Sequence, residues 1–281
     1  HKVAQEALAA QQPRSLVLDT QHDDDVIFGS GSGCRGAMHL LVVPVIPDQQ
    51  NILYGAIVES NSAHQTLTLA VFTDYEHCGM GLGWRGDSYY RFGASSNSLQ
   101  SLERATQGQH SIALDDGETV VANVFVIAPP PRIVVIGASV ETPSLIRIAH
   151  SLGWQVTVVD HRSTQLEKVS AIADHVVAVR PAAALSDHIV FDAALVMSHS
   201  AMTDIEALQT LALRNEKYIG LLGPPARRDE LLSQLTDMQR SSLMLRLHAP
   251  MGLRLGGHGP EALALSILSE LQQFISEIEN R

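Results

Sequence analysis

The chain has 281 residues, enough for two domains that each bury a core of their own. It carries 30 Asp and Glu against 19 Lys and Arg, a formal net charge of −11, and it has no basic block that could neutralise a nucleic acid backbone. The charge argues against a nucleic acid partner. No apolar run reaches the roughly 18 to 20 residues of a membrane-spanning helix, so we expect no membrane span either.

Cysteine usage bears on the compartment. Cys34 and Cys78 are the two cysteines, too few for a disulfide framework, and the sequence shows no secretory signal. We therefore expect a cytoplasmic protein. The chain begins at His1 within a stretch of helical character, which is consistent with a missing N-terminal segment.

Residues 1–128 are predicted to form a mixed α/β domain. Alternating and β-branched residues predict strands at 14–20, 40–45, 66–74 and 118–127, and helical patterns occur at 3–12 and 97–106. The three prolines at 129–131 have no N–H donors and predict a short stiff linker to a second domain.

Residues 132–281 alternate strands with helices. Apolar strands are predicted at 132–138, 155–160, 175–179, 192–198 and 217–223, and a long amphipathic helix is predicted to close the domain from Pro260 onward. Strands separated by helices of this length predict a parallel sheet with helices on both faces, a Rossmann-like domain. The predicted fold class is therefore α/β in both domains.

A glycine-rich loop precedes the second predicted strand. Gly31, Gly33 and Gly36 match the G-x-G-x-x-G spacing of dinucleotide-binding turns. That motif needs a helix after the glycines, whereas the residues that follow read as a strand, so the spacing is weak evidence for a nucleotide.

Cys34 lies inside this loop, next to Arg35. Backbone N–H groups of the turn and the Arg35 charge would favour the thiolate, the form that binds soft metals. The alternative is a small buried thiol in a tight turn. No second Cys or His pair stands at zinc spacing near Cys78, so we expect no zinc.

A second glycine turn follows the first strand of the Rossmann-like domain. Gly137 is present, but Ser139 and Thr142 replace the other two glycines, and Glu141 places a negative charge where a pyrophosphate would bind. Asp160 ends the next strand, where a ribose-binding acid stands in dinucleotide-binding domains. We expect a Rossmann fold that binds NAD(P) weakly or not at all.

Polar residues also follow the other strands of this domain. His199 and Asp204 come after the fourth strand, at the edge where open α/β sheets bind ligands. Arg162, just after Asp160, would add an anion-binding rim. The alternatives are a histidine satisfied by the backbone or by Asp204, and an ordinary solvated loop at Arg162.

Several blocks together resemble the XdhC/CoxI family, accessory factors of xanthine dehydrogenase and related molybdenum hydroxylases. The blocks are, in chain order, GSGSGCRGAMHLLVVPV, VFVIAPPPRIVVIGA, VTVVDHR, MSHSAMTD, YIGLLGPPARRDELL and APMGLRLGGHGPEALALSILSE. Two departures stand out. Gly137-Ala138-Ser139-Val140 replaces the family's Gly-Ala-Gly-His, and the family's upstream serine-glycine-glycine-cysteine segment is not in this chain.

The resemblance implies a chaperone, a protein that needs no catalytic turnover of its own. Such a protein binds the molybdenum cofactor, holds it while a cysteine desulfurase sulfurates it, and assists its insertion into the hydroxylase. The resemblance places Cys34 near the metal, in a loop whose Gly33, Arg35 and Gly36 would also bind the cofactor. As a further hypothesis, Asp160, Arg162, His199 and Asp204 of the Rossmann-like domain bind the cofactor as well. We also expect a homodimer. The alternatives are an NAD(P)-dependent oxidoreductase and a protein–protein adaptor with a vestigial Rossmann domain.

Overall fold

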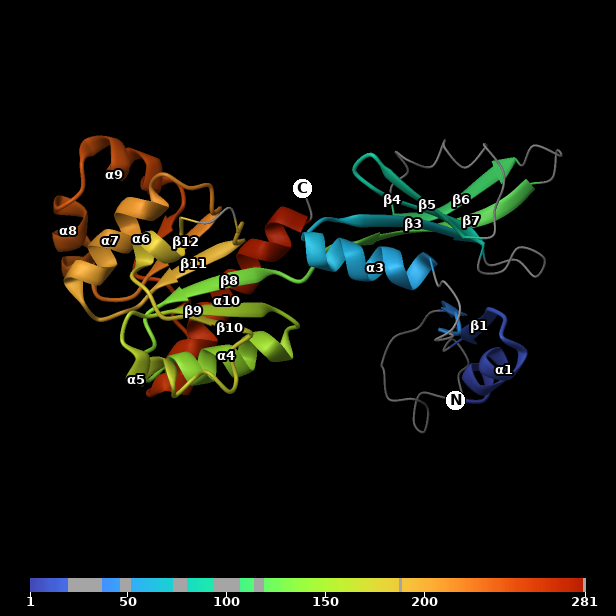
Figure 1. Cartoon of the computed structure of the whole chain (residues 1–281), viewed down its shortest axis with the longest axis horizontal. Coiled ribbons are helices and arrows are strands. Elements are labelled where there is room, and N and C mark those ends of the chain that lie inside the picture. Colours follow the sequence, from blue (N-terminus) through green and yellow to red (C-terminus); the bar gives the residue numbers. More distant parts are fainter. Residues whose placement is uncertain are drawn as a thin grey trace. The chain divides into compact units, whose positions relative to one another are not determined.

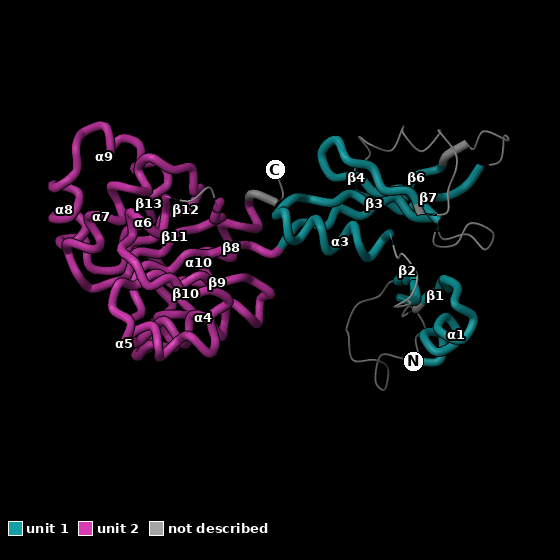
Figure 2. Tube along the Cα trace, viewed as in Figure 1, with its two compact units in different colours: residues 1–129 teal, residues 130–281 magenta. Residues whose placement is uncertain are grey.

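The structure is a computed structural model that divides into two compact units, residues 1–129 and 130–281 (Figure 2). It describes residues 1–19, 37–45, 52–72, 80–92, 107–113, 119–186 and 189–279. The glycine-rich loop with Gly33, Cys34, Arg35 and Gly36 lies outside these residues, as does Cys78. The role predicted for Cys34 therefore stays a prediction.

The first unit is built on a five-stranded antiparallel sheet with the strand order β5-β4-β3-β7-β6. Its strands are β3 (Leu67–Phe72), β4 (Gly81–Arg85), β5 (Ser88–Phe92), β6 (Gly108–Ala113) and β7 (Thr119–Ile127). Helix α3 (Ile52–Ala63) packs against β3, β4 and β5 (Figure 1). Its buried Ala56 meets Leu67, Leu69 and Val71, the residues of β3 that face the helix. A mixed α/β unit is thus confirmed.

The first residues form helix α1 (Lys2–Ala10) and an antiparallel pair of strands, β1 (Arg14–Asp19) and β2 (Ala37–Val42). Strand β2 begins and ends three residues before the predicted 40–45. Pro44 explains where it stops, because proline has no N–H to donate to a strand ladder. The helix predicted at 97–106 lies outside the described residues.

The second unit is a six-stranded parallel sheet with the order β10-β9-β8-β11-β12-β13, which confirms the Rossmann-like prediction. The strands are β8 (Arg132–Ile136), β9 (Gln155–Val159), β10 (His175–Val177), β11 (Ala193–Val196), β12 (Tyr218–Leu221) and β13 (Leu247–His248). The helices are α4 (Thr142–Ser151), α5 (Ser163–Leu166), α6 (Pro181–Ala184), α7 (Ala201–Leu211), α8 (Pro225–Ser233), α9 (Asp237–Met244) and α10 (Pro260–Glu279).

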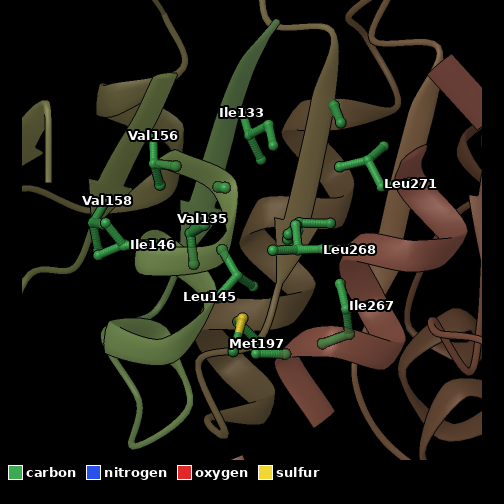
Figure 3. Packing of buried hydrophobic residues seen from close by; sticks show 14 of the residues in the cluster. Ile133, Val135, Leu145, Ile146, Val156, Val158, Met197, Ile267, Leu268 and Leu271 are labelled. Carbon is green, nitrogen blue, oxygen red and sulfur yellow. The ribbon is translucent and has the colours of Figure 1, made fainter. Parts of the chain in front are cut away.

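Both faces of this sheet are covered by helices because successive residues of its strands point to opposite sides. Ile133 and Val135 of β8 pack with α4 and α10, through residues such as Leu145 and Leu268 (Figure 3). Val134 and Ile136 pack on the other side with α7, α8 and α9. Burial on both faces is why these strands read as continuous apolar runs in the sequence.

The strand order determines where a ligand site is expected. The chain runs outward from β8 through β9 to β10, then returns to β11 on the other side of β8. The order therefore reverses between β8 and β11, and open α/β sheets bind ligands outside the carboxyl ends of the strands at such a point.

Among the described residues, no helix is both long enough and apolar enough to cross a membrane.

Candidate functional site

The turn after β8 is packed so closely at position 137 that only glycine fits there. Gly137 has a φ of +108°, and a Cβ built there would lie 2.3 Å from the Ser198 Cα. Its N–H donates to the Val159 carbonyl at 2.8 Å. The turn is therefore pressed between the ends of β9 and β11, at the switch point of the sheet.

Asp160, the predicted ribose-binding acid, already accepts hydrogen bonds from the chain on both oxygens of its carboxylate. Its Oδ2 accepts hydrogen bonds from the Ala138 N–H at 2.9 Å and from Arg162 Nη2 at 2.7 Å. Its Oδ1 accepts from the backbone N–H and from Nε of Arg162, both at 2.9 Å. The Asp160 side chain is only 2% exposed, and that of Arg162 is 41% exposed. A ribose hydroxyl would have to displace Arg162 to reach this carboxylate.

The charge of Asp160 is maintained despite its burial. Burial acts to raise the pKa of Asp160, but the hydrogen bonds from Arg162 and Ala138 and the Arg162 charge outweigh it, so the pKa lies below its ordinary value. The carboxylate is thus ionised at neutral pH and fixes the glycine turn to the end of β9.

Glu141 and His199 form a second pair at the same edge of the sheet. Glu141 precedes the first residue of α4, and its Oε2 lies 3.5 Å from His199 Nε2. Burial acts to raise the pKa of Glu141, but hydrogen bonds from Ser139 and the backbone, together with His199, hold it below its ordinary value. The negative charge predicted to oppose a pyrophosphate is therefore in place.

His199 itself has an unusual backbone. Its φ is +59°, in the left-handed region that few non-glycine residues occupy, although His, Asn and Asp do so more often than the others, and its side chain is 57% exposed. Strain of this kind is concentrated at functional positions. The structure thus presents the imidazole at the carboxyl end of β11, with Glu141 as its partner.

Asp204 does not contact His199. It is buried, and its Oδ1 accepts a hydrogen bond from Ser198 Oγ at 2.5 Å, while its Oδ2 accepts from Arg227 Nη2 at 2.7 Å. Asp204 thereby joins the start of α7 to α8. Of the four residues predicted in this domain, the structure brings Asp160 and Arg162 into direct contact and pairs the other two with different residues.

Sequence reasoning missed a groove beside Glu141. It has a volume of about 510 Å³ and is formed mainly by the loop between β13 and α10. The residues that line it are Glu141, Leu253, Arg254, Leu255, Gly256, Gly257, His258, Gly259, Pro260, Ala262, Leu263 and Ser266. The signal was the Gly-Gly-His-Gly run just before the final helix, since closely spaced glycines mark a backbone that adopts positive φ.

A second cavity, of about 570 Å³, lies at the opposite edge of the sheet. Arg132 and Gln155, which line it, are the first residues of β8 and β9. Ligands of open α/β sheets bind at the carboxyl ends of the strands. The groove beside Glu141 is therefore the candidate site, and this second cavity is not.

No metal site is present among the residues that the structure describes. They contain no group of three or more His, Cys, Asp and Glu placed to hold a metal ion. Cys34, the predicted metal-binding residue, lies outside them.

Comparison with known proteins identifies relatives of both units. Residues 133–271 match the family described as the XdhC Rossmann domain. The chain is 27% identical over 274 residues to a Bacillus subtilis (strain 168) protein named as a probable xanthine dehydrogenase subunit, and the matched region spans 95% of this chain and 78% of that protein. It is also 27% identical over 191 residues to the uncharacterized protein YqeB of Escherichia coli (strain K12), covering 63% of this chain but only 35% of YqeB.

A solved structure matches over nearly the whole chain. The crystal structure of a xanthine dehydrogenase from Bacillus halodurans superposes with a TM-score of 0.76 at 26% identity, covering 98% of this chain and 78% of that one. The similarity therefore includes the first unit as well as the Rossmann-like one.

Proposed function

Since the chain belongs to the XdhC family, as its sequence motifs predicted, we propose that it is an accessory protein of a xanthine dehydrogenase-type molybdenum hydroxylase. In this role it binds the molybdenum cofactor, holds it for sulfuration by a cysteine desulfurase and assists its insertion into the hydroxylase. The observation that carries the proposal is the likeness to xanthine dehydrogenase-named proteins across both units. We also propose that the protein acts in the cytoplasm and as a homodimer.

The residues at the carboxyl edge of the sheet suit an anionic cargo. Arg162 uses Nε and Nη2 on Asp160, which leaves Nη1 and an exposed part of the guanidinium for an anionic group. His199 presents a largely exposed imidazole from the end of β11. These two side chains would contact an anionic part of the cofactor, and Asp160 would hold Arg162 in position. Cys34 is the residue that we propose to contact the metal. The cofactor itself would supply the molybdenum centre that the hydroxylase needs.

The alternative of an NAD(P)-dependent oxidoreductase finds less support in the geometry. Asp160 already accepts four hydrogen bonds from the chain, and Glu141 holds a negative charge at the start of α4. Both positions are those that a dinucleotide needs for its ribose and its pyrophosphate. The remaining alternative, a protein–protein adaptor, differs from the chaperone in that it would retain no cofactor.

Cofactor retention tests the proposal directly. The purified chain is mixed with the molybdenum cofactor and desalted, and the retained molybdenum is measured by mass spectrometry. We expect wild type to retain molybdenum and Cys34→Ser to lose most of it without a change in melting temperature, because a serine hydroxyl is a hard ligand that stays protonated at neutral pH.

Cys78→Ser is the matched control and should retain molybdenum like wild type. Equal losses in the two variants would remove the special role of Cys34. No retention by wild type would contradict the chaperone proposal and favour the adaptor.

A further inference from the structure

The geometry of the groove beside Glu141 points to a binding site for a phosphate ester, held by Arg254 and His258. This inference deepens the proposed function and rests on it in one respect, namely that the phosphate ester is the pterin phosphate of the molybdenum cofactor. His199, the partner of Glu141, does not line the groove, and neither do the other residues predicted from the sequence to bind the cofactor in this unit.

Two basic side chains without partners line the groove. Arg254 and His258 are exposed, and neither forms a hydrogen bond or an ion pair with any residue that the structure describes. Other arginines of this unit, such as Arg214, Arg227 and Arg246, bind carboxylates or carbonyl oxygens of the chain. Arg254 therefore has its guanidinium free for a ligand, and guanidinium groups bind phosphate oxygens well.

Two acidic side chains lie in or beside the groove. Glu141 lines it, and its Oε2 is covered from solvent, has no hydrogen-bond partner among the described residues and lies 3.5 Å from His199 Nε2. The carboxylate of Glu261 accepts a hydrogen bond from Ser144 Oγ at 3.3 Å and is not among the lining residues. The Glu141 carboxylate is thus largely covered, whereas Arg254 and His258 are exposed, which favours an anion bound at these two side chains rather than at Glu141.

The groove is preformed by contacts between its loop and α10. The Leu253 N–H donates to the Ser266 carbonyl at 3.1 Å, and Ser266 Oγ donates back to the Leu253 carbonyl. The Gly252 N–H donates to Glu270, which also accepts from the Tyr218 hydroxyl at 3.0 Å. A site held in shape before binding loses less conformational entropy when the ligand arrives.

The shape of the groove suits more than a bare phosphate ion. Its volume of about 510 Å³ is within the usual range for small-ligand sites, about 300 to 1,000 Å³. Leu253, Leu255 and Leu263 give it apolar walls. At Gly257, where φ is +87°, a Cβ would lie 3.0 Å from the Ala262 Cβ, so a side chain would crowd the groove. Apolar walls beside two basic groups fit a ring system that carries a phosphate.

Phosphate binding provides the first test. Inorganic phosphate and pyrophosphate are titrated into the full chain by calorimetry for wild type, Arg254→Gln, His258→Asn and the double variant. Arg147→Gln is the matched control, since Arg147 is an exposed arginine on α4 that lies outside the groove and whose side chain has no partner among the described residues. We expect the double variant to bind at least about tenfold more weakly and Arg147→Gln to bind like wild type.

Because Arg254 and His258 are exposed and make no described contact, all variants should keep the wild-type melting temperature. A failure of wild type to bind either anion, or an equal loss in Arg147→Gln, would overturn the assignment. Ala262→Leu adds a test that removes no charge, since it fills the groove and should also weaken binding.

Cofactor retention separates this inference from the proposed function. If both hold, the double variant loses molybdenum retention together with phosphate binding, whereas Cys34→Ser loses retention alone. Full retention of molybdenum by a double variant that no longer binds phosphate would overturn the link to the cofactor. If wild type retains no molybdenum yet binds phosphate through Arg254 and His258, the proposed function fails and the groove stands as a phosphate site.

Discussion

Asp160→Asn is expected to destabilise the second unit because the asparagine cannot replace what the carboxylate does. Four N–H donors converge on Asp160, two on each oxygen. An amide of the same shape has one acceptor oxygen, and its NH₂ group would face two of those donors. The Ala138 N–H is the critical one, since it is buried in the glycine turn and has no access to water as a substitute.

The magnitude follows from which donors lose their partner. Leaving a buried N–H unsatisfied costs about 1 to 3 kcal/mol. The interaction with Arg162 contributes less than a buried ion pair would, because its partly exposed guanidinium can turn to water, and we count about 1 kcal/mol for it. The unfolding free energy should thus fall by roughly 2 to 4 kcal/mol, a drop in melting temperature of about 5 to 15 °C for a unit of this size.

Urea denaturation and calorimetry of wild type, Asp160→Asn, Arg162→Gln and the double variant measure this loss and the coupling between the two residues. Asp229→Asn is the control, because Asp229 also pairs with an arginine but is exposed, and it should change stability by less than about 0.5 kcal/mol. A similarly small effect for Asp160→Asn would refute the conclusion that Asp160 anchors the turn, and would leave it free for a ligand.

The architecture of the second unit could be predicted because the burial of each strand and helix leaves its own pattern of apolar residues in the sequence. Strands buried on both faces leave continuous apolar runs, and the helices between them keep an apolar stripe. The first unit was harder. Gly55 interrupts the helical pattern of α3, and its Ile57 and Val58 are β-branched residues that also suit strands. The hairpin of β4 and β5 did have a usable signal, the two-residue turn at Gly86 and Asp87.

The site was predicted in position but not in its connections. That Asp160 and His199 stand at the carboxyl ends of β9 and β11 follows from the strand pattern alone. The strand pattern does not show that the Asp160 carboxylate already accepts four hydrogen bonds. Those bonds depend on the rotamer of Arg162 and on the direction of the Ala138 N–H in the turn, and a sequence pattern contains neither. Asp204 illustrates the same limit, since its partner Arg227 belongs to another helix and is recognised only once the helices are packed.

Three further predictions concern the same edge of the sheet. First, NAD and NADP should bind weakly or not at all in calorimetry, and a dissociation constant in the low micromolar range would revive the oxidoreductase alternative. Second, the Asp160 pKa is below its ordinary value of 3.8 in the folded state, so its contribution to stability is present above that pH and is lost as the pH falls through the folded pKa. Urea melts from pH 6 to about pH 3 should therefore show a smaller acid-induced loss for Asp160→Asn than for wild type, and parallel curves would contradict the assignment. Third, Gly137→Ala should destabilise by about 2 to 5 kcal/mol, because it adds both a strained backbone and a steric clash. Its Cβ would lie 2.3 Å from the Ser198 Cα, whereas at Gly153, which also has positive φ, nothing lies within 4 Å. Gly153→Ala therefore isolates the backbone term and should cost only about 1 kcal/mol. Equal losses in the two variants, measured by calorimetry, would mean that the turn has room to move away from β11, and the close packing at the switch point would not be what demands glycine there.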